Sequence, residues 1–177
     1  MPTLQTPSTG PVKPTDCCPP FVPEPWDGKE VSWKDKPFVR DHVTCLFHVP
    51  LNMGRKVKKD MALIEAAHAK SESNLMLSDD KSPWGADIFI EVARAVPGAT
   101  MDNLSGTFLT KVFEGPFRDA GTWAKEMTEY VAKKGRVLQR LYFGYTTCPK
   151  CSKAYGKNYV VLFAKVNEAE PGTRPST

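Results

Sequence analysis

The pattern of hydrophobic and polar positions changes in a regular order over the first half of the chain. Residues 38–49 (FVRDHVTCLFHV) alternate loosely and are rich in Val and Phe, which is typical of a strand. After a break at Pro50–Gly54, apolar residues recur at helical spacing from Val57 to His68. The predicted elements of this half are a strand over 38–49, a helix over 55–70, a short strand over 75–77 and a strong strand over 86–96.

The same order of elements returns in the second half. A helix with Trp123, Met127 and Val131 on one face ends near Gly135. The segment TTCPKCSKA, residues 146–154, lies between the last two strands and is predicted as a loop. The predicted elements are a strand over 106–114, this helix, and strands over 136–145 and 158–166.

These elements predict an α+β fold made of two β-α-β-β repeats. Trp84-Gly85-Ala86-Asp87 and Tyr155-Gly156-Lys157-Asn158 open the last strand of each half and lie 71 positions apart, which supports a duplication. The alternative is chance agreement between two amphipathic strands. With a pseudo-twofold axis between the halves, each helix would cover an antiparallel sheet, and a small ligand would bind in the inter-repeat cleft.

Proline content predicts the domain boundaries. Eight of the sixteen prolines fall within the first 25 residues, where they disfavour both helix and central strand. We therefore expect a disordered, Pro-rich lead over residues 1–27, a folded domain over 28–167 and a flexible tail over 168–177.

Composition narrows the class of protein. The chain has 177 residues, of which 41% are hydrophobic and 25% charged, as in globular proteins. No apolar run approaches the ~18 residues of a membrane-spanning helix, and the first residues do not resemble a secretion signal. With an odd number of cysteines, five, the sequence predicts a cytoplasmic protein with reduced thiols and no membrane partner.

Charge gives little support for nucleic-acid binding. The net charge is only +4, and the one dense basic cluster is Arg55, Lys56, Lys58 and Lys59 at the start of the first helix. A solvated helix start explains this cluster, and a site for an anionic ligand group is the alternative. No Walker, Rossmann or G-x-S-x-G pattern occurs in the sequence.

Residues 112–135 (VFEGPFRDAGTWAKEMTEYVAKKG) resemble the GyrI-like family of gyrase-inhibitory and bacterial effector-binding domains, which is related in fold to the SOUL proteins. The resemblance rests on the turn Gly115-Pro116-Phe117, on Trp123 and Tyr130 in the helix, and on Gly135. It is strongest to a bacterial branch labelled hydrolase.

The resemblance implies two β-α-β-β repeats that bind an amphipathic small molecule without a cofactor. Some members of the family hydrolyse a reactive electrophile, so the resemblance also implies this activity for the chain. The alternative is a non-catalytic module that sequesters a ligand or binds a protein partner such as gyrase. A family transcription regulator is disfavoured, because a Pro-rich lead cannot supply a helix-turn-helix.

Two glutamates are the candidate catalytic acids, because the last strand departs from the family pattern and has no internal Glu. Glu91 alternates with Ile88, Ile90 and Val92, so a helix over the isoleucine face would leave Glu91 in the cleft. There an apolar environment would raise its pKa, and it would act as a base or bind a ligand cation. A solvent-exposed position is the alternative. Glu114 is either a cleft residue or a helix cap.

Aromatic side chains and one histidine are the candidate ligand-binding residues. Tyr145 and Tyr155 flank the Cys-containing loop, and Trp123 belongs either to the ligand site or to the core. His48 precedes the first helix and lies either in the cleft or in a structural position. The predicted ligand-binding set is Trp84, Phe89, Tyr145, Tyr155, Trp123 and His48.

Cys148 and Cys151 form a C-x-x-C pair with three possible roles. They are reduced turn cysteines, a labile disulfide or two ligands of a metal. A zinc site needs at least one more protein ligand, and the sequence offers no second pair of this kind. We therefore predict no metal, with Cys148 and Cys151 as the residues to test.

Overall fold

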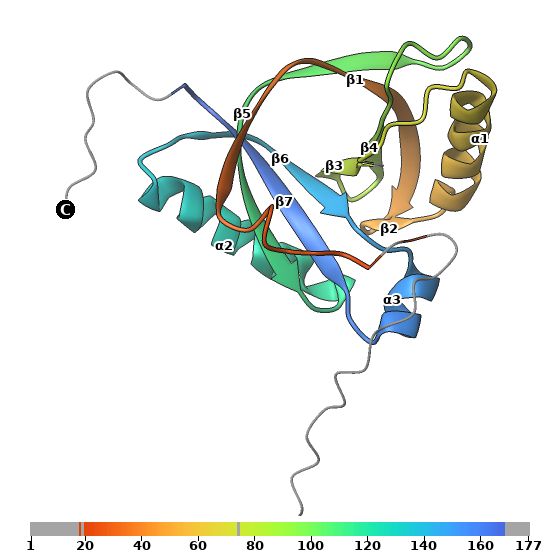
Figure 1. Cartoon of the computed structure of the whole chain (residues 1–177). Coiled ribbons are helices and arrows are strands. Elements are labelled where there is room, and N and C mark those ends of the chain that lie inside the picture. Colours follow the sequence, from red (N-terminus) through yellow and green to blue (C-terminus); the bar gives the residue numbers. More distant parts are fainter. Residues whose placement is uncertain (1–17, 19, 74, 169–177) are drawn as a thin grey trace, which may run out of the picture.

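The computed structural model describes residues 18, 20–73 and 75–168. Its helices and strands follow the predicted order, with additional short elements (Figure 1). In chain order they are β1 (Lys29–Leu46), β2 (Val49–Pro50), α1 (Met53–Ala66), β3 (Met76–Ser82), β4 (Gly85–Glu91), β5 (Met101–Glu114), the 3-10 helix η1 (Phe117–Asp119), α2 (Ala120–Lys133), β6 (Leu138–Tyr145), α3 (Pro149–Tyr155) and β7 (Tyr159–Val166).

The strands form one antiparallel sheet that closes into a barrel. The strand order is β2-β1-β4-β3-β6-β7-β5, and β1 also pairs with β5, which joins the two ends of the sheet. This confirms an α+β fold with antiparallel pairing. The picture of two separate sheets facing each other is corrected, because β3 pairs with β6 as β1 pairs with β5.

Closure of the barrel depends on the unexpected length of β1. The strand begins at Lys29 rather than at 38, and its added part pairs with β5 from Lys29 opposite Thr110. Val31 and Trp33 point to the core within a segment that is otherwise largely charged. The side chains of KEVSWKDK alternate between the two faces of a strand, but the high charge of this segment did not indicate a strand.

The β-α-β-β order occurs twice, and the two halves pair their strands in the same way. In the first half β4 lies between β1 and β3, and in the second half β7 lies between β5 and β6. A twofold axis relating the halves stays a prediction.

Aromatic rings fill the barrel interior. Trp33 packs 4.5 Å from Phe108 and 5.6 Å from Phe163, measured between ring centroids. Complete burial of an aromatic or aliphatic side chain contributes about 1.5–3 kcal/mol. The fully or almost fully buried members of this interior cluster are Phe38, Leu77, Phe89, Phe108, Tyr142 and Phe163.

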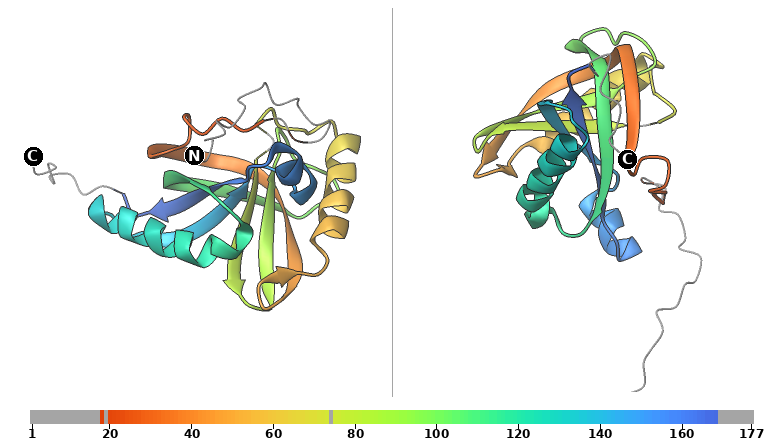
Figure 2. Two further views of the ribbon diagram at one scale, coloured as in Figure 1. Left: turned by 90° about the horizontal axis from the view of Figure 1, so that it is seen from below. Right: turned by 90° about the vertical axis from the view of Figure 1, so that its left-hand side faces the viewer.

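The two long helices lie on different sides of the barrel (Figures 1 and 2). Trp123, Met127 and Val131 of α2 pack against β5, β6 and β7, as their spacing predicted. α1 packs against β1 and β4 through Ile64 and neighbouring apolar residues.

The basic cluster at the start of α1 contacts a carboxylate on β1. Lys56 Nζ and Lys59 Nζ each lie 2.9 Å from an oxygen of Asp41. Burial disfavours the charge on Asp41, but hydrogen bonds from Lys59 and Lys56 outweigh it and lower its pKa to about 2. Two of the four cations thus have a structural partner.

Part of the Pro-rich segment packs against the barrel. Residues 1–17 and 19 lie outside the described residues, but residues 20–27 are described. The Phe21 ring lies 5.7 Å from that of Tyr159, and the Trp26 ring lies 5.6 Å from that of Phe163. Thr110 Oγ1 donates a hydrogen bond of 2.5 Å to the Trp26 carbonyl. Residues 20–27 thus belong to no helix or strand, as the prolines predicted, but they contact the barrel.

The segment predicted as a loop contains the short helix α3. Cys148 precedes it, Pro149 stands in its first turn, and Gly156 ends it with a φ of 67°. A proline is tolerated there because the first N–H groups of a helix have no intrahelical partner, and glycine adopts positive φ without strain. These start and stop signals explain a helix within TTCPKCSKA.

Candidate functional site

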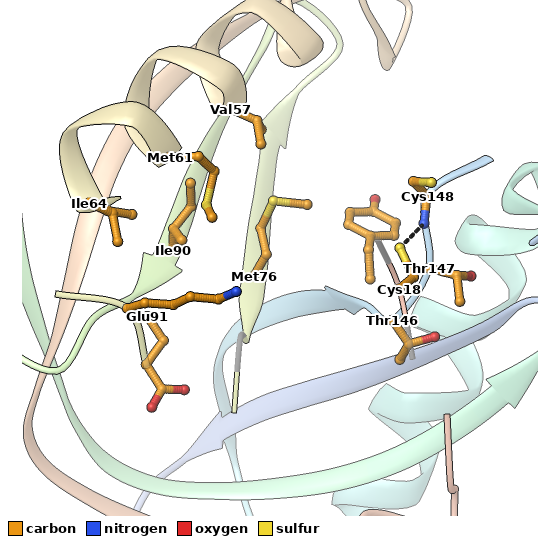
Figure 3. Close-up of a pocket in the computed structure, with 12 residues that line it drawn as sticks. Cys18, Val57, Met61, Ile64, Met76, Ile90, Glu91, Thr146, Thr147 and Cys148 are labelled. Carbon is orange, nitrogen blue, oxygen red and sulfur yellow. Dashed lines mark hydrogen bonds between the residues drawn. The ribbon is translucent and has the colours of Figure 1, made fainter. Parts of the chain in front are cut away.

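A pocket of about 290 Å³ lies beside the barrel, between α1 and the end of β6 (Figure 3). One wall is apolar and comes from α1, β3 and β4. The opposite wall comes from the end of β6, the residues before α3, and Cys18. The lining residues are Val57, Met61, Ile64, Met76 and Ile90 on the apolar wall, Lys70 and Glu91 at one end, and Cys18, Tyr145, Thr146, Thr147 and Cys148 on the opposite wall.

The alternation of β4 explains why this wall is apolar. Ile90 packs with Ile64 under α1, and Ile88 packs with Val57 of the same helix. Phe89 points the other way, into the barrel, where it is fully buried. The helix thus covers the isoleucine face, as the pattern predicted.

Glu91 is the last residue of β4 and lines the pocket with only 8% of its surface exposed. Its Oε1 accepts a hydrogen bond of 2.7 Å from Ser71 Oγ and lies 2.9 Å from Lys36 Nζ. Its Oε2 accepts a hydrogen bond from Ser73 Oγ. Both carboxylate oxygens therefore have partners inside the protein.

These partners reverse the expected shift of the Glu91 pKa. Burial alone would raise it, but hydrogen bonds from Ser73, Lys36 and Ser71 together hold the pKa below its ordinary value. The expectation of a raised pKa was wrong, because two serines and a lysine from other segments solvate the carboxylate. Glu91 is a fixed anion at neutral pH and a weak base.

Tyr145 is the predicted aromatic that lines the pocket. Burial raises its pKa, and the nearby Asp80 and Cys45 add to the effect, so its hydroxyl stays protonated at neutral pH. Tyr155 is not among the lining residues and donates a hydrogen bond to the Cys18 carbonyl. Tyr155 thus contacts the segment that forms part of the pocket wall.

The other predicted site residues lie away from this pocket. Phe89 is in the barrel interior and Trp123 is in the core beneath α2. Trp84 is 58% exposed and packs on Phe47, with 5.2 Å between ring centroids. Glu114 and His48 are exposed and do not line the pocket.

A charged network beside the aromatic residues of the barrel was not predicted from the sequence. Arg40 Nη2 lies 2.8 Å from Asp87, and Arg140 Nε lies 2.6 Å from Asp79. The Arg140 guanidinium also lies 5.2 Å from the Tyr142 ring centroid. The signal was the alternation of apolar with charged residues in β1 and β4, which places arginines and aspartates on the face that carries the core aromatics.

Three thiols come together at the pocket wall. The Sγ atoms of Cys18, Cys148 and Cys151 all lie within 4.8 Å of one another, and the last two are 3.4 Å apart. Cys151 is buried, whereas Cys18 and Cys148 are half-buried. Cys18 falls in the Pro-rich lead that was expected to be disordered, so this third thiol was not predicted.

The chain is thus a small α+β domain, an antiparallel barrel flanked by helices with a pocket that has one apolar wall. Residues 9–166 match the family described as bacterial hydrolase, and the chain belongs to this family. No curated protein matches the chain. Among the described residues, no helix has the length and apolar character needed to cross a bilayer.

The fold is similar to a solved structure entitled "The structure of SAV2435 bound to tetraphenylphosphonium". The TM-score is 0.50 and the sequence identity is 7%, over 78% of this chain and 93% of that one. At this identity the similarity concerns the fold.

Proposed function

We propose that the chain binds an amphipathic small molecule in the pocket beside α1, with a preference for a lipophilic cation. The observation that carries this proposal is that an apolar wall and the ionised Glu91, whose carboxylate points away from Ile64 and Ile90 in Figure 3, line the same pocket. Apolar walls supply most of the binding free energy in such pockets, and a few polar groups supply orientation.

Two further observations support the proposal. The similar structure of SAV2435 holds tetraphenylphosphonium, which is a lipophilic cation. The repeated β-α-β-β order also supports assignment to the GyrI-like type, whose members bind ligands of this kind. The pocket lies outside the barrel, but residues of both halves line it, from Val57 to Glu91 in the first and from Tyr145 to Cys148 in the second, which supports a site between the repeats.

The test uses a pair of probes with similar shape and opposite charge, tetraphenylphosphonium and tetraphenylborate. Titration calorimetry of the full chain should show tighter binding of the cation. Glu91→Gln should weaken cation binding about five- to tenfold, which corresponds to about 1–1.4 kcal/mol, and should remove the preference over the anion.

Glu114→Gln is the matched control, because Glu114 is an exposed glutamate outside the pocket lining. It should leave both affinities unchanged. Tighter binding of tetraphenylborate by the unmodified chain would contradict the proposal and would indicate that Lys70 determines the charge preference.

Hydrolysis of a bound electrophile is the second candidate function, because the chain belongs to a family described as hydrolases. A water oxygen would bond to the electrophilic carbon as the bond from that carbon to the leaving atom breaks, and the leaving atom would take the proton lost by water. Glu91 would orient this water. With a lipophilic epoxide as probe, product formation should fall about 100-fold in Glu91→Gln and stay unchanged in Glu114→Gln. Equal rates in the unmodified chain and Glu91→Gln would contradict the hydrolase proposal. The chain would then be a non-catalytic module that binds a ligand or gyrase.

A further inference from the structure

The cluster of Cys18, Cys148 and Cys151 brings together residues that are far apart in the sequence. Cys148 and Cys151 flank the start of α3, with the two-residue spacing common among zinc ligands. Cys18 precedes the packed segment 20–27. A contact across 130 positions requires that this segment be held in place by the fold.

Specific contacts hold Cys18 against α3. The Tyr155 hydroxyl donates to the Cys18 carbonyl, and the Cys148 N–H donates to Cys18 Sγ at 3.4 Å. Three residues further along, Phe21 packs on Tyr159 at the start of β7. The position of the third sulfur is therefore set by both backbone and side-chain contacts.

The spacing of the sulfurs fits tetrahedral coordination. Zinc–sulfur bonds of about 2.3 Å at tetrahedral angles separate the sulfur atoms by about 3.8 Å. The observed separations are 3.4 Å for Cys148 and Cys151 and no more than 4.8 Å for any pair in the cluster. A shift of less than about 1 Å in each sulfur would bring all three to one metal.

We propose that Cys18, Cys148 and Cys151 bind one zinc ion at the wall of the pocket. Three thiolates form a soft ligand set that selects zinc over magnesium or calcium. Cys18 and Cys148 line the pocket, and Cys151 is buried, so the proposed ion would lie at the pocket wall.

This proposal does not depend on the ligand preference proposed above. It changes the expectation of no metal, which rested on the two thiols Cys148 and Cys151. The alternative is that Cys148 and Cys151 form a disulfide instead of binding zinc. The experiment below distinguishes the zinc site from the disulfide.

The experiment measures zinc in the full chain purified without chelators and kept in a thiol-free reductant. Mass spectrometry for metals should find about one zinc per chain in the unmodified protein. Cys18→Ser should lower the zinc affinity at least tenfold, measured by competition with a chromogenic chelator. Cys45→Ser is the matched control, because Cys45 is a buried cysteine outside the cluster, and it should retain the metal.

Cobalt(II) substitution of the unmodified chain provides a measurement that does not rely on the folding of variants. Tetrahedral thiolate ligation should give intense visible and near-ultraviolet absorption, which zinc should displace. Less than a tenth of an equivalent of zinc after incubation with zinc ions would overturn the proposal. Equal zinc affinity in Cys18→Ser and the unmodified chain, or a Cys148–Cys151 disulfide that persists under reductant, would also overturn it.

Discussion

At the scale of single residues, Glu91 is held by groups from separate segments of the chain. Lys36 comes from β1, whereas Ser71 and Ser73 come from the connection between α1 and β3. The carboxylate therefore links two segments in addition to lining the pocket. Its charge contributes to stability only while it is ionised, because the serine and lysine donors favour the anion.

Glu91→Gln should lower the free energy of unfolding at pH 7 by about 1–3 kcal/mol, the range for a hydrogen-bonded buried charge. Since the native pKa is lowered, the contribution is fully present above the unfolded-state pKa of about 4.3. It is lost as the pH falls through the native value. Urea unfolding across this pH range should therefore show the difference between the two proteins shrink on acidification.

Glu114→Gln again provides the control, since an exposed side chain should change stability by less than about 0.5 kcal/mol. A difference between Glu91→Gln and the unmodified chain that stays constant down to pH 3 would contradict this account of the carboxylate.

At the scale of elements, the segment 20–27 acts as a strap across the barrel. Its two aromatic residues pack against residues of β7, and its backbone accepts a hydrogen bond from β5. The prolines prevent this segment from joining the sheet, but they do not prevent its side chains from being partly buried. Proline content therefore predicted that this segment has no helix or strand, but it did not predict that the segment packs against the barrel.

Removal of residues 1–27 should lower the melting temperature by about 5 °C or more. It exposes the barrel aromatics beneath Phe21 and Trp26, at a cost of about 2–4 kcal/mol, and each kcal/mol shifts a domain of this size by roughly 2–4 °C. Differential scanning calorimetry measures the change. A chain that begins at Cys18 retains these contacts and should melt close to the full chain, and a loss below about 2 °C on removing 1–27 would show that the strap adds little.

At the scale of the whole molecule, the buried faces of single helices and strands could be predicted from the sequence. Contacts between segments that are far apart in the sequence could not. The strand alternation around Ile90 and the stripe of α2 are local patterns, and each identified the buried face correctly. The pairing of β1 with β5 and the approach of Cys18 to Cys148 join distant segments. Neither leaves a periodic signal, because each depends on how the remaining elements pack.

In the candidate site, too, local features could be predicted from the sequence, whereas contacts between distant segments could not. Alternation predicted that Glu91 lies on the face of β4 opposite Ile90, whereas its hydrogen bonds to Ser71 and Ser73 depend on the path of the loop. Trp84 was chosen for its residue type, and the fold places it on the surface. Phe89 was chosen because alternation puts it on the face of the strand opposite Ile88 and Ile90, and that face is the barrel interior rather than a ligand cleft. The superposition of the two halves about a twofold axis stays a prediction.

The closure of the barrel by β1 and β5 bears on synthesis at the ribosome. β1 is translated first, but its partner β5 is complete only at Glu114, and Phe163 of the interior comes later still, in β7. The nascent chain therefore carries exposed aromatic side chains until nearly all of the domain has emerged. Because pairing between such distant strands is slow and leaves apolar surface exposed, this is the period in which chaperones would protect the chain from aggregation.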